Sequence, residues 1–356
     1  MIVKKLKLYN YRNYSSYQFE FKEGINILLG KNGIGKTNAI EAIYYLSLGR
    51  SFRGVDDEDL IKEGENVATI DSTIGIGNLS RQVEVIISKS GRIIKINKKP
   101  VSKLSDLAKT INVILFEPKD VLLFKGSPKD RRDFLNISLS KYSSSYLSYI
   151  SQYNKVLKER NDVLKSEKVD QTLLDTTTEM LVKLAGPIIK YRTAYLKDIN
   201  DILIKITRAL TGVHKEISIN YHPFVEFDDN YEENARKAFN KALEADLKHK
   251  ATSIGIHRED FSINLFDRDI AIFGSQGENR LVALALKLAP YFLIEDKDKK
   301  PIVVLDDVMS ELDEVHQQKL IKFLKNFEQV FITATKLVVV GASHYEIKEN
   351  KWNGGL

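Results

Sequence analysis

The sequence predicts an α/β fold with antiparallel and mostly parallel sheets, interrupted by an inserted and mainly helical lobe. Three observations support this. Residues 30–37 read Gly-Lys-Asn-Gly-Ile-Gly-Lys-Thr, a phosphate-binding loop pattern that lies between a strand pattern and a helical pattern. A continuous apolar run at 302–305 is typical of a central strand covered on both faces. Strand patterns occupy both ends of the chain, whereas helical spacing dominates residues 119–253.

These patterns divide the 356 residues into two parts, and the chain is long enough to build both. We expect residues 1–118 and 254–356 to form a nucleotide-binding head and residues 119–253 to form a helical lobe. The helix expected near 275–294 falls in the head by sequence, although packing with the helical lobe is the alternative for it.

The N-terminal part begins with two predicted strands, residues 2–9 and 17–21, joined by a polar turn at 10–14. An apolar strand at 25–29 leads into the glycine-rich loop, and a helix follows from Lys36. Alternating patterns at 67–76, 82–88 and 92–96 predict an antiparallel meander. Asn97-Lys98 is its expected last turn, although Asn-Gly would be a stronger hairpin signal. A short buried strand at 113–116 is stopped by Pro118.

The predicted lobe contains three helical patterns, at about 142–164, 173–210 and 232–248, with a strand at 217–221. Pro187 predicts a kink or a break in the second helix. Tyrosines recur at 142, 146, 149 and 153 at helical spacing. They form either a base-stacking platform or the core seam of a helical hairpin, and the spacing favours the core seam.

The C-terminal part returns to strand patterns from 254, with alternation at 261–265 and then at Ile270 and Ile272. A helix is expected from Ser275 to about Ile294, and the apolar strand at 302–305 follows it. A helix at about 313–326 leads to a buried strand at 330–333. Residues 337–340 and 344–348 are predicted as late strands.

Composition restricts the class of protein. Hydrophobic residues make up 43% and charged residues 29%, as in an ordinary globular protein. The net charge of +6 permits contact with nucleic acid without demonstrating it. The absence of cysteine excludes disulfides and thiolate metal sites and fits a reducing cytoplasm. No apolar run approaches the roughly 20 residues of a membrane span, so we expect a cytoplasmic protein without a membrane partner.

The glycine-rich loop carries the first half of a nucleotide site. Its glycines let the backbone curl around a phosphate, and the following helix directs its positive end toward it. Lys36 is expected to reach the β- and γ-phosphates, and Thr37 to hold Mg²⁺. The residues expected to bind nucleotide here are Gly30, Lys31, Asn32, Gly33, Ile34, Gly35, Lys36, Thr37 and Asn38.

The apolar strand at 302–305 ends in an acid pair that supplies the second half. We assign Asp306 to magnesium and Asp307 to orienting or deprotonating the attacking water. The alternative is a pair of solvated acids at a strand end. Because the Asp307 side chain is one methylene shorter than glutamate, we hypothesise that hydrolysis is slow.

Ser275-Gln276-Gly277-Glu278 has the pattern of a capping box, with serine at the N-cap and an acid three residues later. Such a helix start is also an anion site. Ser275 and the Gly277 backbone would then complete the nucleotide site of a second subunit, which implies a dimer.

The residues alone leave two possible roles for each of three further sites. Thr333 is either a γ-phosphate sensor or a structural residue. Arg12 either reaches phosphate or lies on the surface. Ser310-Glu311-Leu312-Asp313 opens a helix. This is either its whole role, or it also contacts a second subunit near the nucleotide of that subunit.

These motifs, in this order, resemble the heads of ABC-type ATPases. More narrowly, the chain is similar to the RecF family of bacterial recombination-mediator ATPases. The matching stretches run from end to end, at 6–14, 30–52, 113–122, 125–135, 255–260, 275–289 and 305–313. Asn279 and Lys98 depart from the family's pattern, and the helical insert beyond about 165 matches only loosely.

The resemblance implies a weak DNA-stimulated ATPase with ATP and Mg²⁺ as cofactors, and a homodimer that depends on ATP. It also implies binding to double-stranded DNA and to junctions of single- and double-stranded DNA. RecR and RecO would be its partners in loading recombinase at gaps during DNA repair and replication restart.

A basic segment accompanies these motifs. Residues 119–160 contain nine Lys or Arg and four Asp or Glu. Lys129, Arg131 and Arg132 cluster before a helix, where they either contact DNA phosphates or form a solvated face. His257 lies beside Arg258, and a histidine in this setting is more often structural than a metal ligand.

Three other classes are less consistent with the sequence. The motor subunit of a membrane transporter is disfavoured by the basic segment and by the RecF-like stretches. A chromosome-architecture head would carry a far longer coiled coil than an insert of about 135 residues. A binding module with a dead nucleotide site is opposed by the intact Lys36, Thr37, Asp306 and Asp307.

Overall fold

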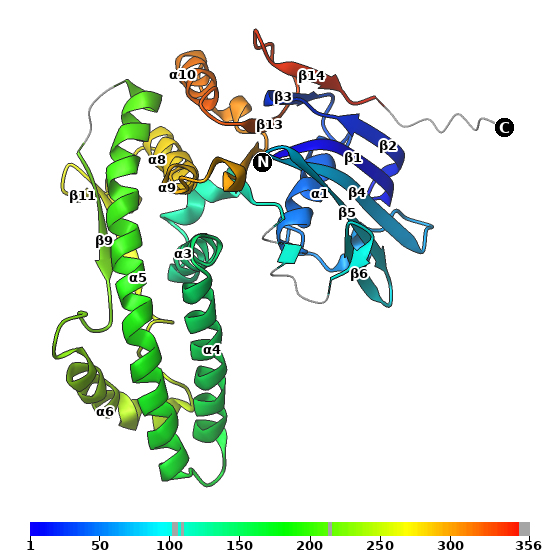
Figure 1. Cartoon of the computed structure of the whole chain (residues 1–356). Coiled ribbons are helices and arrows are strands. Elements are labelled where there is room, and N and C mark those ends of the chain that lie inside the picture. Colours follow the sequence, from blue (N-terminus) through cyan, green and yellow to red (C-terminus); the bar gives the residue numbers. More distant parts are fainter. Residues whose placement is uncertain (102–105, 108–109, 213–215, 349–356) are drawn as a thin grey trace. The chain divides into compact units, whose positions relative to one another are not determined.

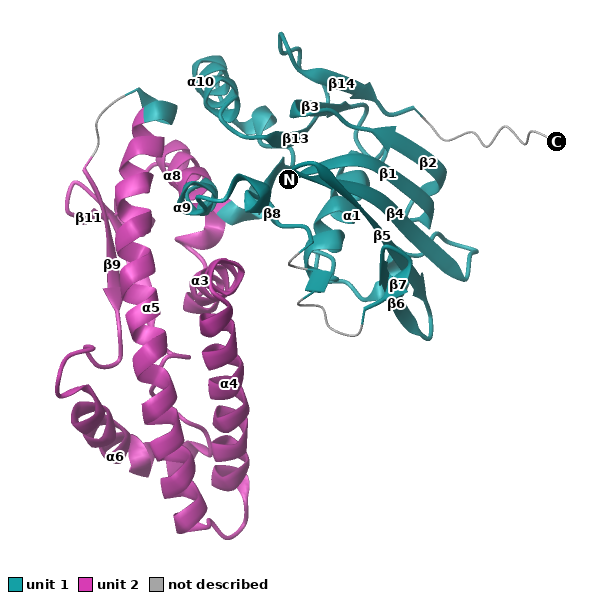
Figure 2. Ribbon diagram, viewed as in Figure 1, with its two compact units in different colours: residues 1–120, 209–212, 287–356 teal, residues 121–208, 213–286 magenta. Residues whose placement is uncertain are grey.

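The computed structural model describes residues 1–101, 106–107, 110–212 and 216–348 (Figure 1). The chain forms two compact units: unit 1 comprises 1–120, 209–212 and 287–356, and unit 2 comprises 121–208 and 213–286 (Figure 2). The expected return to the head at 254 therefore needs correction, because the strand at 260–265 pairs with the strand at 217–222 inside unit 2. Residues 349–356 of the predicted head lie outside the described residues.

Unit 1 contains two sheets. An antiparallel sheet has the order β2-β1-β4-β5-β6-β7, and a parallel sheet has the order β14-β3-β13-β12-β8. The antiparallel strands are β1 (Ile2–Tyr11), β2 (Tyr14–Glu20), β4 (Val67–Ile76), β5 (Leu79–Ser88), β6 (Gly91–Ile96) and β7 (Lys99–Pro100). The parallel strands are β3 (Gly24–Leu29), β8 (Val113–Phe116), β12 (Ile302–Leu305), β13 (Gln329–Ala334) and β14 (Ser343–Glu346).

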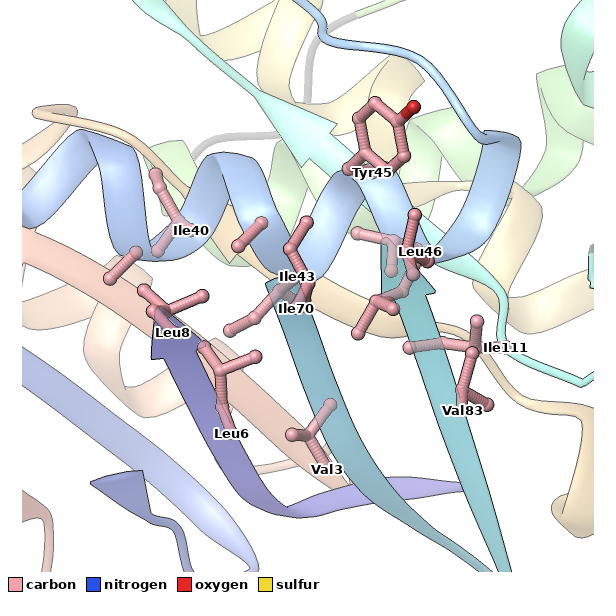
Figure 3. Close-up of a cluster of buried hydrophobic side chains, with 14 of the residues drawn as sticks. Val3, Leu6, Leu8, Ile40, Ile43, Tyr45, Leu46, Ile70, Val83 and Ile111 are labelled. Carbon is pink, nitrogen blue, oxygen red and sulfur yellow. The ribbon is translucent and has the colours of Figure 1, made fainter. Parts of the chain in front are cut away.

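Helix α1 (Lys36–Leu48) is buried in the core of this unit. Figure 3 shows its apolar side chains packed against those of the antiparallel sheet. The same cluster includes Ile302, Val304 and Phe331 from the parallel sheet. The residues labelled in Figure 3 are Val3, Leu6, Leu8, Ile40, Ile43, Tyr45, Leu46, Ile70, Val83 and Ile111. Burial of apolar area on the helix therefore fixes the start of α1, where the glycine-rich loop ends.

Short helices complete unit 1. They are η1 (Asp57–Leu60), the first half of η2 (Pro118–Leu123), α9 (Pro290–Leu293), η3 (Lys297–Lys299), η4 (Met309–Glu311) and α10 (Glu314–Leu324). The single helix expected at 275–294 is instead divided into α8 (Gln276–Leu288) and α9, because Pro290 lacks the backbone N–H that continuing the helix would require.

Unit 2 is mainly helical, with a small antiparallel sheet of order β11-β10-β9. Its helices are α3 (Pro128–Tyr142), α4 (Ser144–Lys165), the greater part of α5 (Gln171–Thr211), α6 (Tyr231–His249), α7 (Ile270–Phe273) and the greater part of α8. Its strands are β9 (Ile217–His222), β10 (Asp260–Leu265) and β11 (Arg268–Asp269). None of the described helices is long and apolar enough to cross a membrane.

Buried polar groups join the helices of unit 2. Arg192 of α5 donates to Glu259 at 2.5 Å and to the hydroxyl of Tyr146 at 3.2 Å. Tyr146 and Tyr153 are fully buried. Their burial favours the core-seam interpretation of the tyrosine spacing for these two residues, since a fully buried ring cannot stack on a base.

Helix α5 continues through Pro187, which excludes a break there and leaves the kink as the prediction for this position. Two predictions of secondary structure are wrong. Residues 270–273 form helix α7 and no strand. Residues 337–340 form no strand, and the alternate side chains Val338 and Val340 are 88% and 91% exposed. Val339 between them is buried, so this apolar run covers one side chain without forming a strand.

His257 is a structural residue of unit 2. Its Nε2 lies 3.0 Å from the carbonyl oxygen of Thr252, which can only accept, so Nε2 carries the hydrogen. Nδ1 then accepts from the hydroxyl of Tyr153 at 3.2 Å. Burial lowers the pKa of His257 to about 4, so the ring is neutral in the folded protein at pH 7.

We expect this histidine to make the protein less stable in mild acid. The unfolded chain binds a proton on His257 near pH 6.5, whereas the folded chain does so near pH 4. Protonation of His257 therefore does not reduce the free energy of unfolding above pH 6.5. It reduces this free energy by about 3 kcal/mol as the pH falls to 4. Urea unfolding of His257→Gln should show a smaller loss between pH 7 and 5 than the unaltered protein. The exposed His249→Gln serves as the control and should lose as much unfolding free energy between pH 7 and 5 as the unaltered protein. An equally large loss in His257→Gln would contradict the assignment.

Candidate nucleotide-binding site

The glycine-rich loop and the start of α1 form the first half of the site. The loop contains three glycines with positive φ, at 30, 33 and 35, and α1 begins at Lys36 directly after them. The Nζ atom of Lys36 donates to the carbonyl oxygens of Gly30 and Lys31, at 2.7 and 2.9 Å. Burial lowers the pKa of Lys36, and the negative charges of Asp307 and Asp306 act against that shift. The ammonium group is thus held at the mouth of the loop.

The turn between β1 and β2 supports the glycine-rich loop through hydrogen bonds to its carbonyl groups. Asn13 donates to the carbonyl of Ile34 at 2.8 Å, and the Tyr14 hydroxyl donates to that of Gly35 at 2.9 Å. A Cβ at Gly35 would lie 2.7 Å from the Asn13 amide, and φ there is 115°. Both the contact and the backbone conformation therefore require glycine. The sequence interpretation missed Asn13 and Tyr14, although both lie in the polar turn that it predicted.

Asp306, directly after β12, links helix α1 to strand β13 at the second half of the site. Its Oδ1 atom accepts from the hydroxyls of Thr37, at 3.0 Å, and Thr333, at 2.7 Å. Burial raises the pKa of Asp306, and the two hydroxyl donors act against that rise. The expected pair of Thr37 and Asp306 is therefore assembled, with two hard oxygen atoms of the kind that Mg²⁺ prefers.

Thr333 is a structural link at this position. It is 1% exposed, donates to Asp306, and accepts the backbone N–H of Asp307 at 2.9 Å. Because its hydroxyl hydrogen is already donated, the geometry favours the structural alternative over a γ-phosphate sensor.

Asp307 differs from Asp306 in its surroundings. Its side chain is exposed and its backbone adopts the left-handed conformation, with φ of 48°. The bond from its N–H to Thr333 and the bond from Ser310 to its carbonyl oxygen hold this backbone in place. Asp307 thus presents a solvent-accessible carboxylate beside the buried Asp306.

Arg12 is half-buried and held by three contacts within unit 1, and its contact with phosphate stays a prediction. Its Nε and Nη2 atoms donate to the two carboxylate oxygens of Glu41, at 2.9 and 2.8 Å, and Nη1 donates to the carbonyl of Asp59. Glu41 is fully buried on α1 and also accepts from Ser51 at 2.5 Å. Arg53 lies 3.8 Å from the same carboxylate. Sequence analysis missed Glu41, whose signal is an acid among the apolar residues of α1.

The helix start at Ser275 belongs to unit 2 and has the predicted capping box. The backbone N–H of Glu278 donates to the Ser275 hydroxyl, and Glu278 accepts the backbone N–H of Ser275. The Asn279 amide donates to the carbonyls of Gly274 and Ser275, so this departure from the family's pattern supports the helix start. A Cβ at Gly277 would meet no atom within 4 Å, so packing does not require glycine there. Residues 275–277 are exposed.

The predicted cluster of cations on α3 needs correction. Arg131 donates to both carboxylate oxygens of Asp260 at 2.7 Å, and its Nη1 atom donates to three carbonyls. Arg132 donates to the carbonyl of Glu259 at 3.0 Å. Arg131 therefore has a structural role, because Nε, Nη1 and Nη2 all donate within unit 2. Lys129 is exposed.

Comparisons with known proteins find relatives that match almost the whole chain. A family model described as "RecF/RecN/SMC N terminal domain" matches residues 2–349. The DNA replication and repair protein RecF of Clostridioides difficile (strain 630) is 36% identical, with 99% of this chain and 95% of the relative covered. The chain belongs to the RecF family. Another RecF, from Bacillus cereus (strain B4264), is 35% identical, with 99% of this chain and 96% of the relative covered.

Solved structures extend the RecF likeness to three dimensions. A structure of the recombination mediator protein RecF with ATP, of the RecFOR pathway, has a TM-score of 0.88 at 32% identity, covering 98% of this chain and 97% of that one. The Smc head of Pyrococcus furiosus bound to the C-terminal domain of ScpA has a TM-score of 0.57 at 15% identity, with 94% and 89% covered. The second likeness shows only that the ABC-type head fold is shared.

Proposed function

We propose that this RecF-family chain is a DNA-binding ATPase of recombinational DNA repair and replication restart. One observation carries the ATPase proposal: the Thr37 hydroxyl and the Asp306 carboxylate meet at 3.0 Å, beside a loop that holds the Lys36 ammonium. This set of groups suits a nucleotide triphosphate with Mg²⁺. Relatives with this fold include a RecF whose structure contains ATP.

Each group has a proposed role. The loop N–H groups and Lys36 hold the phosphates, while Thr37 and Asp306 would hold Mg²⁺, which neutralises phosphate charge when it is bound. Asp307 accepts a proton from the attacking water. Because its carboxylate is short and exposed, it holds that water loosely, and we propose weak hydrolysis that DNA stimulates.

A homodimer that depends on ATP is the second part of the proposal. Ser275 and Gly277 would face the γ-phosphate held by a second copy. Two observations support a partner at these places. The capped helix start is exposed, and Ile272 and Phe273 just before it are 73% and 64% exposed. In unit 1, Val338 and Val340 follow Thr333 closely and are even more exposed. Large apolar side chains left in water next to site motifs are typical of an interface.

The partners proposed for the dimer are double-stranded DNA, junctions of duplex with single strand, and the mediator proteins RecR and RecO. ATP bridges two copies and so favours the dimer, and hydrolysis removes the bridging phosphate. In this scheme nucleotide controls how long the dimer stays on DNA near a gap, where recombinase is loaded.

Sedimentation velocity with fluorescent gapped duplex tests the proposal. The chain should sediment as a monomer without nucleotide, and as a DNA-bound dimer with ATP and Mg²⁺. Plain duplex and single strand serve as comparison ligands. Equal dimerisation with and without ATP would refute the nucleotide switch, and failure to bind any of the three DNAs would refute the DNA-binding role.

A further inference from the structure

The free edge of the antiparallel sheet carries an excess of positive charge. Residues 79–101 contain six Lys or Arg and one acid, a net charge of +5, whereas the whole chain carries +6. They form β5, β6 and β7, and β7 is the last strand in the sheet order (Figure 2). The six cations are Arg81, Lys89, Arg92, Lys95, Lys98 and Lys99.

Two of these six cations form ion pairs within the described part of unit 1. Arg92 pairs with Asp57 at 2.9 Å, and Lys95 pairs with Glu84 at 2.7 Å. Lys89, Lys98 and Lys99 are exposed, and they form no ion pair with any residue that the structure describes. Their charge is therefore not used to stabilise unit 1.

Lys98 also occupies a backbone conformation that disfavours lysine. It is the second residue of the β6–β7 turn, with φ of 66°, and Asn97 before it has φ of 50°. Such a turn favours Asn-Gly, because glycine adopts positive φ without strain. Lysine at this position costs local stability, so its charge is the property that requires another explanation.

We propose that this β6–β7 edge is a contact surface for DNA phosphates. Lys89 lies in the turn at one end of β6, and Lys98 and Lys99 lie at the other. Strand geometry places the two ends about 20 Å apart, the length of roughly six base pairs. A row of unpaired lysines on this scale complements one phosphate backbone and reads no base sequence. The inference rests on the proposed DNA-binding function, because it names the surface used.

The test replaces two lysines without endangering the fold. Lys98→Gly combined with Lys99→Gln should leave the urea unfolding midpoint unchanged or higher, because the turn becomes Asn-Gly. Affinity for duplex DNA, measured by fluorescence anisotropy with ATP present, should fall about tenfold at moderate salt. The slope of log affinity against log salt should become shallower by about 2, since each phosphate contact contributes about 0.9.

The matched control is Lys322→Gln on α10 with Lys325→Gln directly after its last residue. Both lysines are exposed, and they form no ion pair with the described residues. DNA affinity and salt slope should stay close to those of the unaltered chain. An unchanged affinity in the β6–β7 variant, or an equal loss in the control, would overturn the proposed surface. The proposed function itself fails only if the unaltered chain does not bind DNA.

Discussion

Lys36→Ala is expected to weaken ATP binding by about a hundredfold. The Lys36 ammonium is buried at the mouth of the loop, between the carbonyls of Gly30 and Lys31. In the proposed complex it exchanges these neutral acceptors for charged phosphate oxygens. Hydrogen bonds to charged groups contribute about 1.5–3 kcal/mol each, so losing two of them at the lower end of this range corresponds to roughly a hundredfold change. Isothermal titration calorimetry with ATP and Mg²⁺ measures this directly.

Lys31→Ala is the matched control, because its side chain is exposed on the same loop and only its carbonyl contacts Lys36. ATP affinity should change by no more than a few fold in this variant. Circular dichroism should show that both variants keep the fold. Binding of ATP by Lys36→Ala with the affinity of the unaltered chain would remove Lys36 from the site.

Local signals were sufficient for the parts of the site that lie next to each other in sequence. The strand at 25–29, the loop and the start of α1 are contiguous, and their spacing gives both the structure and the chemistry. The apolar run at 302–305 likewise predicts a central strand, and the acids at its end follow. Hydrophobic burial and glycine geometry decide these elements locally, so the sequence alone contains enough information.

Contacts between distant segments explain what was missed. Asn13 supports residue 34, and Arg12 pairs with Glu41, across 21 and 29 residues of sequence. Arg131 pairs with Asp260 across 129 residues, which turns an apparent DNA contact into a structural ion pair. Pairing of this kind depends on the tertiary fold and leaves no periodic signal along the chain. The charge of a side chain can thus be read from sequence, whereas its partner cannot.

Asp307→Asn is expected to lower the rate of ATP hydrolysis by about a hundredfold or more and to trap the dimer in its ATP-bound form. Asparagine can orient a water but cannot accept its proton, and general-base catalysis contributes about 10²–10⁴ to a rate. Asn tolerates the positive φ of this position as well as Asp does, so the backbone should not change. Thr37 and Asp306 remain in place to bind nucleotide, and Thr333 still supports Asp306.

Phosphate release and light scattering, followed in the same sample, separate the two effects. The variant should dimerise with ATP as the unaltered chain does, but it should return to monomer far more slowly. Asp56→Asn is the matched control, because Asp56 is also exposed and its side chain caps no backbone N–H of η1. Both rates should remain unchanged in that control.

The trapped dimer also tests which surfaces meet, because the chain contains no cysteine. In the proposed arrangement, the helix start of one copy faces the glycine-rich loop of the other. Cysteines introduced at Gln276 and Lys31, two exposed positions, should therefore be joined between chains by a short thiol crosslinker when ATP is present. A dimer that accumulates with ATP but gives no such crosslink would show that the copies associate through other faces. Hydrolysis by Asp307→Asn at the normal rate would instead show that Asp307 is not the base.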